Sequence, residues 1–286
     1  MSQVGEAGWQ QVIWQPKLDG LVHDVPIKCF VRGDPSVHLY LGYGEEALAT
    51  RYGVTLLAGL GLDSAGVVLP FHHLEPTAAN LELIAVEAPL AVAEALNQKA
   101  GKAPDAEVDL IAKSQGGGVA LMTAGAAPER YGALALIAPA GLTREALGDT
   151  PLQRRWRFLG RFIIENGLDP TMDPRRDPGN VLAIYEVSRR MIGDILGGRL
   201  KAKLDFALSM NLAGQLASLS EDHPARLFAG MEDSVFRLAE YAQSLGKVSC
   251  LDLIEPIAGP HAPTLNAAGA EQLLIAGRWI RSLVAS

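Results

Sequence analysis

The feature that most constrains this chain is the run Ala112-Lys113-Ser114-Gln115-Gly116-Gly117-Gly118, which follows the apolar segment 108–111. The pattern predicts a short buried strand, a tight turn at Ser114 and a helix that starts in glycines. This is the layout of a nucleophile elbow, in which the serine takes strained dihedrals and residues two positions away must be small. Ala112 and Gly116 meet that requirement. Taken alone, the motif also fits a glycine-rich turn that carries a surface serine.

Two later segments add an acid and a histidine in a fixed order. The run 225–229 reads as a strand that enters a loop ending in Glu232-Asp233. A further strand is predicted over 248–254, and the loop 258–263 after it presents His261. Serine, then acid, then histidine, each on a loop after a strand, is the chain order of a catalytic triad on an α/β sheet.

On these residues the chain resembles the α/β-hydrolase superfamily, from about Val25 to the C-terminus. The resemblance implies that Ser114 is the nucleophile, Asp233 the triad acid and His261 the general base. Alanine at 112 departs from the first glycine of G-x-S-x-G. Three other acids compete for the second role, Glu232, Asp222 and Asp252, and Asp233 is preferred because it occupies the position that the family pattern uses.

The expected fold class is α/β: an α/β-hydrolase fold with a mostly parallel sheet, helices on both faces and a helical cap insertion. The expected division is core 1–142, helical cap 143–223 and core 224–286. Apolar residues at helical spacing predict the cap helices: Leu152, Trp156, Leu159 and Ile163, then Ile184, Val187, Met191 and Ile195, then Leu200, Leu204 and Leu208.

The core strands are expected in two groups. The segments 12–14, 25–31 and 37–41 fit an antiparallel edge. Buried parallel strands are expected over 54–57, 81–87, 108–111 and 133–138. Helices are expected over 89–99 and 266–284.

The strand expected over 54–57 would end at Ala58-Gly59-Leu60. By resemblance, the backbone N–H groups of Leu60 and Gln115 would then form the oxyanion hole. A plain glycine turn between a strand and a helix is the alternative at Leu60. A phosphate loop is set aside because no G-K-[ST] follows.

Composition excludes several classes of partner. The formal net charge of −7 and the pI near 5.4 argue against nucleic acid. The longest apolar stretch, 133–142, is too short to span a membrane, and the N-terminal residues lack a secretory signal pattern. Cys29 and Cys250 are expected to be buried free thiols, which suits a cytoplasmic protein.

Metal and cofactor chemistry have little support in the sequence. The adjacent His72 and His73 lack an acidic partner at ligand spacing, so no metal is expected, and the triad needs no cofactor. The sequence also contains a set of arginines at helical spacing, Arg154, Arg157 and Arg161. This set fits a solvent-exposed helix face better than an anion-binding site.

The sequence therefore predicts a serine hydrolase that cleaves a small or medium hydrophobic acyl substrate of ester type. Carbon–carbon bond hydrolysis, thioester hydrolysis and acyl transfer use the same triad and stay open. From another class, a ligand-binding sensor without catalysis also stays open. The expected partner is a small-molecule acyl substrate, and the choice between a monomer and a homodimer is open.

Overall fold

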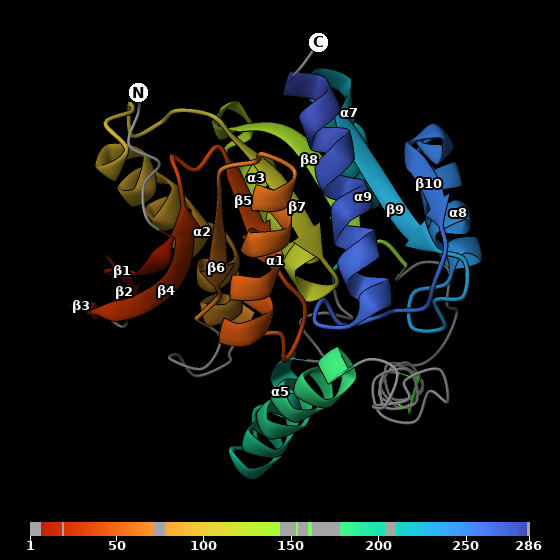
Figure 1. Ribbon diagram of the computed structural model, residues 1–286, viewed down its shortest axis with the longest axis horizontal. Helices are drawn as coiled ribbons and strands as arrows, with labels where there is room; N and C mark the ends of the chain where they lie inside the picture. Colours follow the sequence, from red (N-terminus) through yellow and green to blue (C-terminus); the bar gives the residue numbers. More distant parts are fainter. Residues whose placement is uncertain are drawn as a thin grey trace.

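The computed structural model describes residues 7–18, 20–70, 78–143, 153, 160–161, 178–203 and 210–284. An eight-stranded sheet forms the centre of the molecule (Figure 1), with strand order β1-β4-β6-β5-β7-β8-β9-β10. Its strands are β1 (Gly8–Trp14), β4 (Val25–Arg32), β5 (Val37–Tyr40), β6 (Ser64–Val68), β7 (Val108–Lys113), β8 (Tyr131–Ile137), β9 (Ala225–Gly230) and β10 (Ile254–Ile257). The short strands β2 (Lys17–Leu18) and β3 (Leu21–Val22) pair separately.

The sheet is parallel except at one side. β1 pairs antiparallel with β4, and β4 pairs antiparallel with β6, whereas every pair from β6 through β10 is parallel. The carboxyl ends of the parallel strands therefore meet at one edge of the sheet, where α/β proteins place their ligands. The predicted α/β class with a mostly parallel sheet is confirmed.

Helices cover both faces of the sheet (Figure 1). The described helices are α1 (Ala47–Gly59), α2 (Ala78–Lys99), α3 (Gln115–Ala126), α5 (Pro178–Leu196), α7 (Ala213–Asp222), α8 (Leu238–Gly246) and α9 (Ala267–Val284), with 3-10 turns η1 (Pro128–Arg130) and η4 (Leu251–Leu253). Buried residues of α2, α3, α7 and α8 share one apolar core, and those of α1 and α9 share the other. The two faces of the sheet thus bury separate cores.

The predicted strand over 54–57 is wrong, because these residues lie in α1. Val54 and Leu57 are buried, whereas Thr55 is exposed and Leu56 is partly exposed. This spacing of three is helical, and a four-residue apolar run cannot by itself separate a strand from one turn of a buried helix. The strand paired between β4 and β5 is β6, ten residues later in the chain, which the sequence analysis did not predict.

The predicted strand over 81–87 is also wrong, since α2 runs without a break through Pro89. Proline lacks an N–H and leaves the carbonyl four residues earlier without its helical donor. Here the hydroxyl of Thr123 on α3 donates to the carbonyl of Ala85 at 2.6 Å, which replaces the lost bond. This bond from α3 therefore stabilises the continuous helix α2 at Pro89, a residue that otherwise favours a helix boundary.

Two other strand predictions need correction. The segment 37–41 contains β5, which lies in the parallel part of the sheet between β6 and β7 and not at an antiparallel edge. The strand predicted over 248–254 is displaced, because Leu251–Leu253 form a 3-10 turn and β10 begins only at Ile254. Ser249 takes a φ of 60°, which interrupts extended backbone before that turn.

Within the segment expected to be the cap, α5 docks on the loop between β5 and α1. Glu186 accepts hydrogen bonds from the backbone N–H groups of Glu46, Leu48 and Ala49, at 3.2, 2.8 and 3.4 Å. These are orphan donors of the first turn of α1, which has no side-chain cap of its own. The helix predicted around Val187 is thus confirmed, with Val187 and Met191 on the core, but Ile195 of the predicted stripe is exposed. The next helix, α7, packs against α3.

Several predicted features lie outside the described residues. These are most of the stripe from Leu152 to Ile163, Arg154 and Arg157, the pair His72-His73, and the positions of Leu204 and Leu208. Arg161 is described and lies 3.8 Å from a carboxylate oxygen of Glu240. No helix in the described part of the chain is long and apolar enough to cross a membrane. Cys29 and Cys250 are both buried free thiols, and burial raises the pKa of Cys29 to about 12.

A buried histidine makes the fold sensitive to acid. His38 on β5 is fully buried, and neither ring nitrogen has a hydrogen-bond partner among the described residues. Burial, with a smaller contribution from the charge of Lys102, lowers the pKa of His38 from 6.5 to about 4. Between these values the unfolded chain binds a proton that the folded chain excludes, so protonation favours unfolding.

We therefore expect the free energy of unfolding to fall by about 3 kcal/mol from this one group as the pH is lowered from neutrality to about 4. In His38→Leu that part of the pH dependence should disappear, while the exposed His23→Leu should keep the wild-type slope. Urea unfolding of the three proteins across this range measures the difference. An unchanged slope in His38→Leu would contradict the assignment.

Candidate active site

Ser114 stands at the turn between β7 and α3. Its φ of 52° and ψ of −122° lie in a region that residues with a side chain rarely adopt. The turn is held by backbone bonds, since the N–H of Ser114 donates to the carbonyl of Ile137 at 2.9 Å and its carbonyl accepts from Ala140 at 2.8 Å. The strained strand–turn–helix geometry expected of an elbow is therefore present.

The glycine after the turn permits a close approach of two backbones. A Cβ at Gly116 would lie 2.5 Å from the carbonyl oxygens of both Tyr40 and Leu41. No side chain fits there unless the end of β5 moves. The turn at Ser114 therefore packs closely against the start of loop 41–46, which connects β5 to α1.

The three predicted triad residues come together at this edge of the sheet. Nε2 of His261 lies 3.1 Å from Oγ of Ser114, and Nδ1 lies 3.0 Å from Oδ2 of Asp233. All three residues are buried, with exposed fractions of 4 to 5%. Oδ1 of Asp233 accepts from the N–H of Phe236 at 2.7 Å, and the Phe236 ring packs edge-on against the imidazole at 5.3 Å. The acid and the base are therefore each fixed by a second contact.

The competing acids lie elsewhere. Glu232 is exposed, and its carboxylate accepts from the backbone N–H of Gly259. Asp222 is exposed at the end of α7, and Asp252 is exposed in the 3-10 turn before β10. Of the acids that the sequence analysis compared, Asp233 alone contacts His261.

The prediction that Leu60 supplies an oxyanion-hole donor is wrong. Its N–H donates to the carbonyl of Leu57 at 2.9 Å, as part of the C-terminal turn of α1. Its side chain lies against α9, where a Cβ on Gly277 would meet it at 2.7 Å. The error follows from the strand wrongly predicted over 54–57. In chain order, β5 is the third strand of the eight-stranded sheet, and the loop that follows it is 41–46.

Gly42 and Gln115 flank the serine. A Cβ on Gly42 would be 3.0 Å from Cβ and 3.5 Å from Oγ of Ser114, so this loop runs directly beside the nucleophile. Gln115 is the first residue of α3, and the first N–H groups of a helix have no acceptor within it. The sequence signal for loop 41–46 was the pair of glycines, 42 and 44, directly after a predicted strand.

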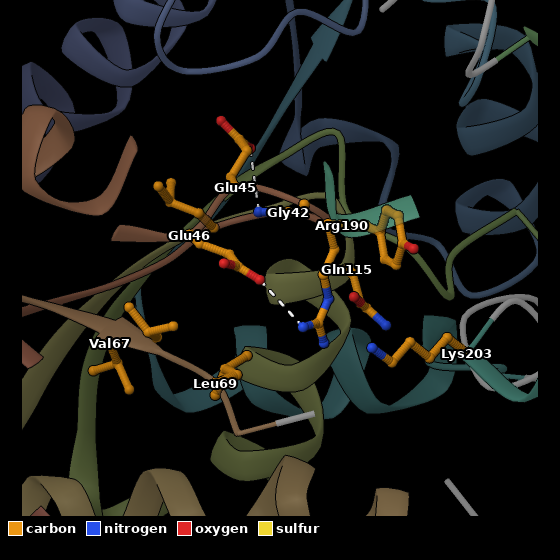
Figure 2. A pocket seen from close by; sticks show the side chains of 12 residues that line it. Gly42, Glu45, Glu46, Val67, Leu69, Gln115, Arg190 and Lys203 are labelled. Atoms are coloured by element: carbon orange, nitrogen blue, oxygen red, sulfur yellow. Dashed lines mark hydrogen bonds and ion pairs between the residues drawn. The ribbon is translucent and has the colours of Figure 1, made fainter. Parts of the chain in front are cut away.

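A cavity open to solvent lies beside this loop (Figure 2), and its empty space of about 460 Å³ includes part of that solvent. Leu41, Val67 and Leu69 give it an apolar side. Arg190 of α5 and Lys203 point into the same space as Gln115, and Arg190 pairs with Glu46 at 3.2 Å. A smaller recess of about 240 Å³ adjoins it and is lined by Ser114 and His261. Space for a ligand thus extends from the nucleophile to the docked helix.

The cationic side of the cavity is organised by Asp194. This fully buried carboxylate accepts from Nζ of Lys203 at 2.8 and 3.0 Å and from the hydroxyl of Tyr43 at 2.8 Å. Burial opposes its charge, but these donors outweigh that effect and hold the pKa of Asp194 below its usual value. Burial also lowers the pKa of Lys203 to about 8. Sequence patterns gave no sign of this network, whose Tyr43 lies 151 residues before Asp194 in the chain.

Comparison with known proteins identifies the fold. No family model and no curated protein sequence matches this chain. Among solved structures, a thermophilic esterase from Thermogutta terrifontis superposes with a TM-score of 0.62 at 17% identity, covering 96% of this chain and 99% of the esterase. The 2-hydroxy-6-oxo-6-phenylhexa-2,4-dienoate hydrolase from Rhodococcus sp. strain RHA1 gives 0.61 at 17% identity, covering 96% and 100%. The chain has the α/β-hydrolase fold.

Other α/β-hydrolase structures match over similar lengths. The thioesterase domain from the curacin biosynthetic pathway superposes with a TM-score of 0.57 at 15% identity, covering 95% of this chain and 99% of that domain. In the α/β-hydrolase fold, the second oxyanion donor comes from the loop between the third strand and the first helix. In this chain that loop is 41–46, in agreement with the position of Gly42 beside Ser114.

Proposed function

We propose that this protein is a serine hydrolase that cleaves a small or medium acyl substrate of ester type through an acyl-enzyme. The observation that carries the proposal is the continuous hydrogen-bonded chain from Ser114 through His261 to Asp233, at 3.1 and 3.0 Å. A nucleophile, a base and an orienting acid in this order are the arrangement that activates a serine for acyl transfer.

In the proposed mechanism, Nε2 of His261 takes the hydroxyl proton of Ser114 while Oγ attacks the carbonyl carbon. Asp233 holds the imidazole in the required tautomer and stabilises the imidazolium. The proton then passes to the leaving alkoxide as the carbonyl–oxygen bond breaks, which leaves an acyl-serine. Water attacks next, gives its proton to His261, and releases the acid as Ser114 recovers the proton.

The developing oxyanion requires two donors at about 3 Å. We assign one to the backbone N–H of Gln115, as predicted, and the other to the loop 41–46 in place of Leu60. Support for the second comes from the contact between Gly42 and Ser114. The N–H of Gly42 already donates to Glu45 at 3.2 Å, so this carboxylate orders the backbone of that loop.

The docked helix α5 supports the proposal that residues 143–223 include a cap over the site. Its residues Val187 and Arg190 line the two recesses beside Ser114. The apolar side formed by Val67 and Leu69 favours a hydrophobic acyl group, whereas Arg190 and Lys203 favour a polar or anionic end. A substrate that combines both fits the cavity better than a wholly apolar one.

The cationic side also favours a second candidate, carbon–carbon bond hydrolysis of an anionic diketone. The dienoate hydrolase from Rhodococcus has the same fold, and an anionic group would complement Arg190 and Lys203. Thioester hydrolysis and acyl transfer stay open as further alternatives on the same triad. A ligand-binding sensor without turnover would not require the acid Asp233 and the base His261 beside Ser114.

Steady-state turnover of the wild-type protein separates these candidates. The panel consists of nitrophenyl esters of increasing acyl length, acyl thioesters, and diketones with and without a carboxylate. We expect hydrolysis of the short and medium esters, and a higher kcat/KM for a substrate that carries a carboxylate than for its neutral analogue. Turnover of the diketone alone would favour the second candidate, and binding without turnover of any compound would contradict both.

A further inference from the structure

A buried ion pair lies beside the triad, and the mechanism above does not use it. Lys113, the residue before Ser114, and Glu45 of loop 41–46 have side chains only 3 and 6% exposed, and Nζ lies 3.4 Å from Oε2. Burying two charges carries a desolvation penalty, so replacing such a pair by apolar residues is often neutral or stabilising. Its presence next to the nucleophile therefore calls for a role other than stability.

Both partners also bind the histidine loop. Nζ of Lys113 donates to the carbonyl of Ala262, directly after His261, and lies 3.4 Å from the hydroxyl oxygen of Thr264. The carboxylate of Glu45 accepts from the backbone N–H of Thr264 as well as from that of Gly42. The same two side chains thus connect the nucleophile turn, loop 41–46 and the loop that carries the base.

The surroundings keep Glu45 ionised. Burial opposes its charge, but Lys113 and the donors from Thr264 and Gly42 outweigh burial and hold the pKa of Glu45 below its usual value. Burial lowers the pKa of Lys113, an effect that Glu45 and, more weakly, Asp233 oppose. The charge of Lys113 is therefore within electrostatic reach of the acid of the triad.

We propose that Lys113 and Glu45 are positioning residues that hold Ser114, loop 41–46 and His261 in the correct positions relative to one another. The inference rests on the proposed hydrolase function. The three segments follow different strands of the sheet, and catalytic groups must be held to within about 0.5 Å for efficient catalysis. One ammonium with three donors and one carboxylate with two oxygens supply contacts to all three.

The pair also sets the electrostatics around the base. Among the described residues, the charged or titratable groups near His261 are Asp233, Lys113, Glu45, Glu232 on the neighbouring Gly259, and Tyr241, whose pKa is raised by burial and further by Asp233. Lys113 and Glu45 largely cancel as a pair. Removing Lys113 leaves the negative charge of Glu45, which favours the imidazolium of His261. Removing Glu45 leaves the positive charge of Lys113, which disfavours the imidazolium.

The test compares kcat, KM and the pH profile of ester hydrolysis for the wild type, Lys113→Met/Glu45→Gln, and each single variant. Lys102→Met is the matched control, because Lys102 also pairs with a carboxylate, Asp34 at 2.9 Å, and with a carbonyl, but at the surface. In the double variant we expect kcat to fall by about 10- to 100-fold with little change in KM. The control should match the wild type.

The pH midpoint of kcat/KM adds a readout that a purely structural role would not move. Glu45→Gln should shift it down and Lys113→Met should shift it up, each by about half a unit or more, while the double variant stays near the wild type. Thermal unfolding of each variant is measured alongside.

Three results would overturn the proposal. The first is a folded double variant with wild-type kcat, and the second is a pair of single variants whose pH midpoints do not move apart. The third is failure of all these variants to fold, since the pair would then be a requirement of the fold and not of the site. A wild-type protein without turnover instead contradicts the proposed function, and it is measured first.

Discussion

Replacing His261 with alanine is expected to lower kcat for an activated ester by about 10⁴- to 10⁶-fold. In the proposed mechanism His261 accepts the proton of Ser114 and later that of water, and no other histidine among the described residues forms a hydrogen bond with Ser114 or Asp233. Because the imidazole serves both steps, acylation and deacylation fail together. The measurement is steady-state hydrolysis, with binding of a non-hydrolysable analogue measured by calorimetry.

The same variant separates an enzyme from a sensor. We expect the analogue to bind His261→Ala with an affinity within about tenfold of the wild type, since the imidazole acts on the transition state more than on the bound ligand. His223→Ala, at the C-terminal end of α7, is the control and should retain wild-type turnover. Equal slow turnover in the wild type and His261→Ala would contradict the triad.

The second large effect is expected for Asp233→Asn, which should lower kcat by about 10³- to 10⁴-fold while the protein stays folded. The amide is isosteric with the carboxylate, but it can hold the imidazole in the wrong tautomer and does not stabilise the imidazolium. The oxygen that accepts from Phe236 can be retained, so the loop geometry is expected to survive.

The neighbouring acid provides the control for Asp233. Glu232→Gln should lower kcat by less than about tenfold, because this exposed carboxylate contacts only the backbone of Gly259 in the histidine loop. Steady-state kinetics and circular dichroism of both variants give the comparison. A larger loss in Glu232→Gln than in Asp233→Asn would place the acid one residue earlier.

The proximity of Ser114, Asp233 and His261 could be predicted from the sequence because each of them carries a local signal. Ser114 lies in a small-residue turn between a buried strand and a helix, and Asp233 and His261 each follow an apolar run. These signals depend on residues within about ten positions, which is the range over which a single sequence is informative. The structure brings the three side chains together at the edge that parallel strands share.

The position of loop 41–46 beside Ser114 could not be predicted, because its sequence signal conflicted with a stronger one. Val54-Thr55-Leu56-Leu57 has the β-branched, apolar character of a buried strand, whereas the true strand β6 contains the small residues Ser64, Ala65 and Gly66. A Cβ on Gly66 would meet Thr50 and Val54 of α1 at 2.4 and 3.0 Å. Close packing of α1 against β6 therefore selects weak strand formers, and tertiary contacts override local propensity.

The ion pair of Lys113 and Glu45 could not be predicted from the sequence for a different reason. Lys113 stands at a variable position of the elbow motif, and Glu45 follows the two glycines of loop 41–46. The 67 residues between them include β6 and α2, so no local pattern connects them. The cavity side formed by Arg190 and Lys203, which both pair with the buried Asp194, likewise depends on how α5 docks.

Mass spectrometry of the protein after reaction with a fluorophosphonate tests the central claim, that Ser114 is an activated nucleophile, most directly. We predict one adduct for each chain, located by peptide mapping on Ser114, and no adduct in a folded Ser114→Ala variant. The labelling rate should fall strongly in His261→Ala, because the hydroxyl then has no base. An adduct on another serine, or equal labelling of the wild type and Ser114→Ala, would contradict the account.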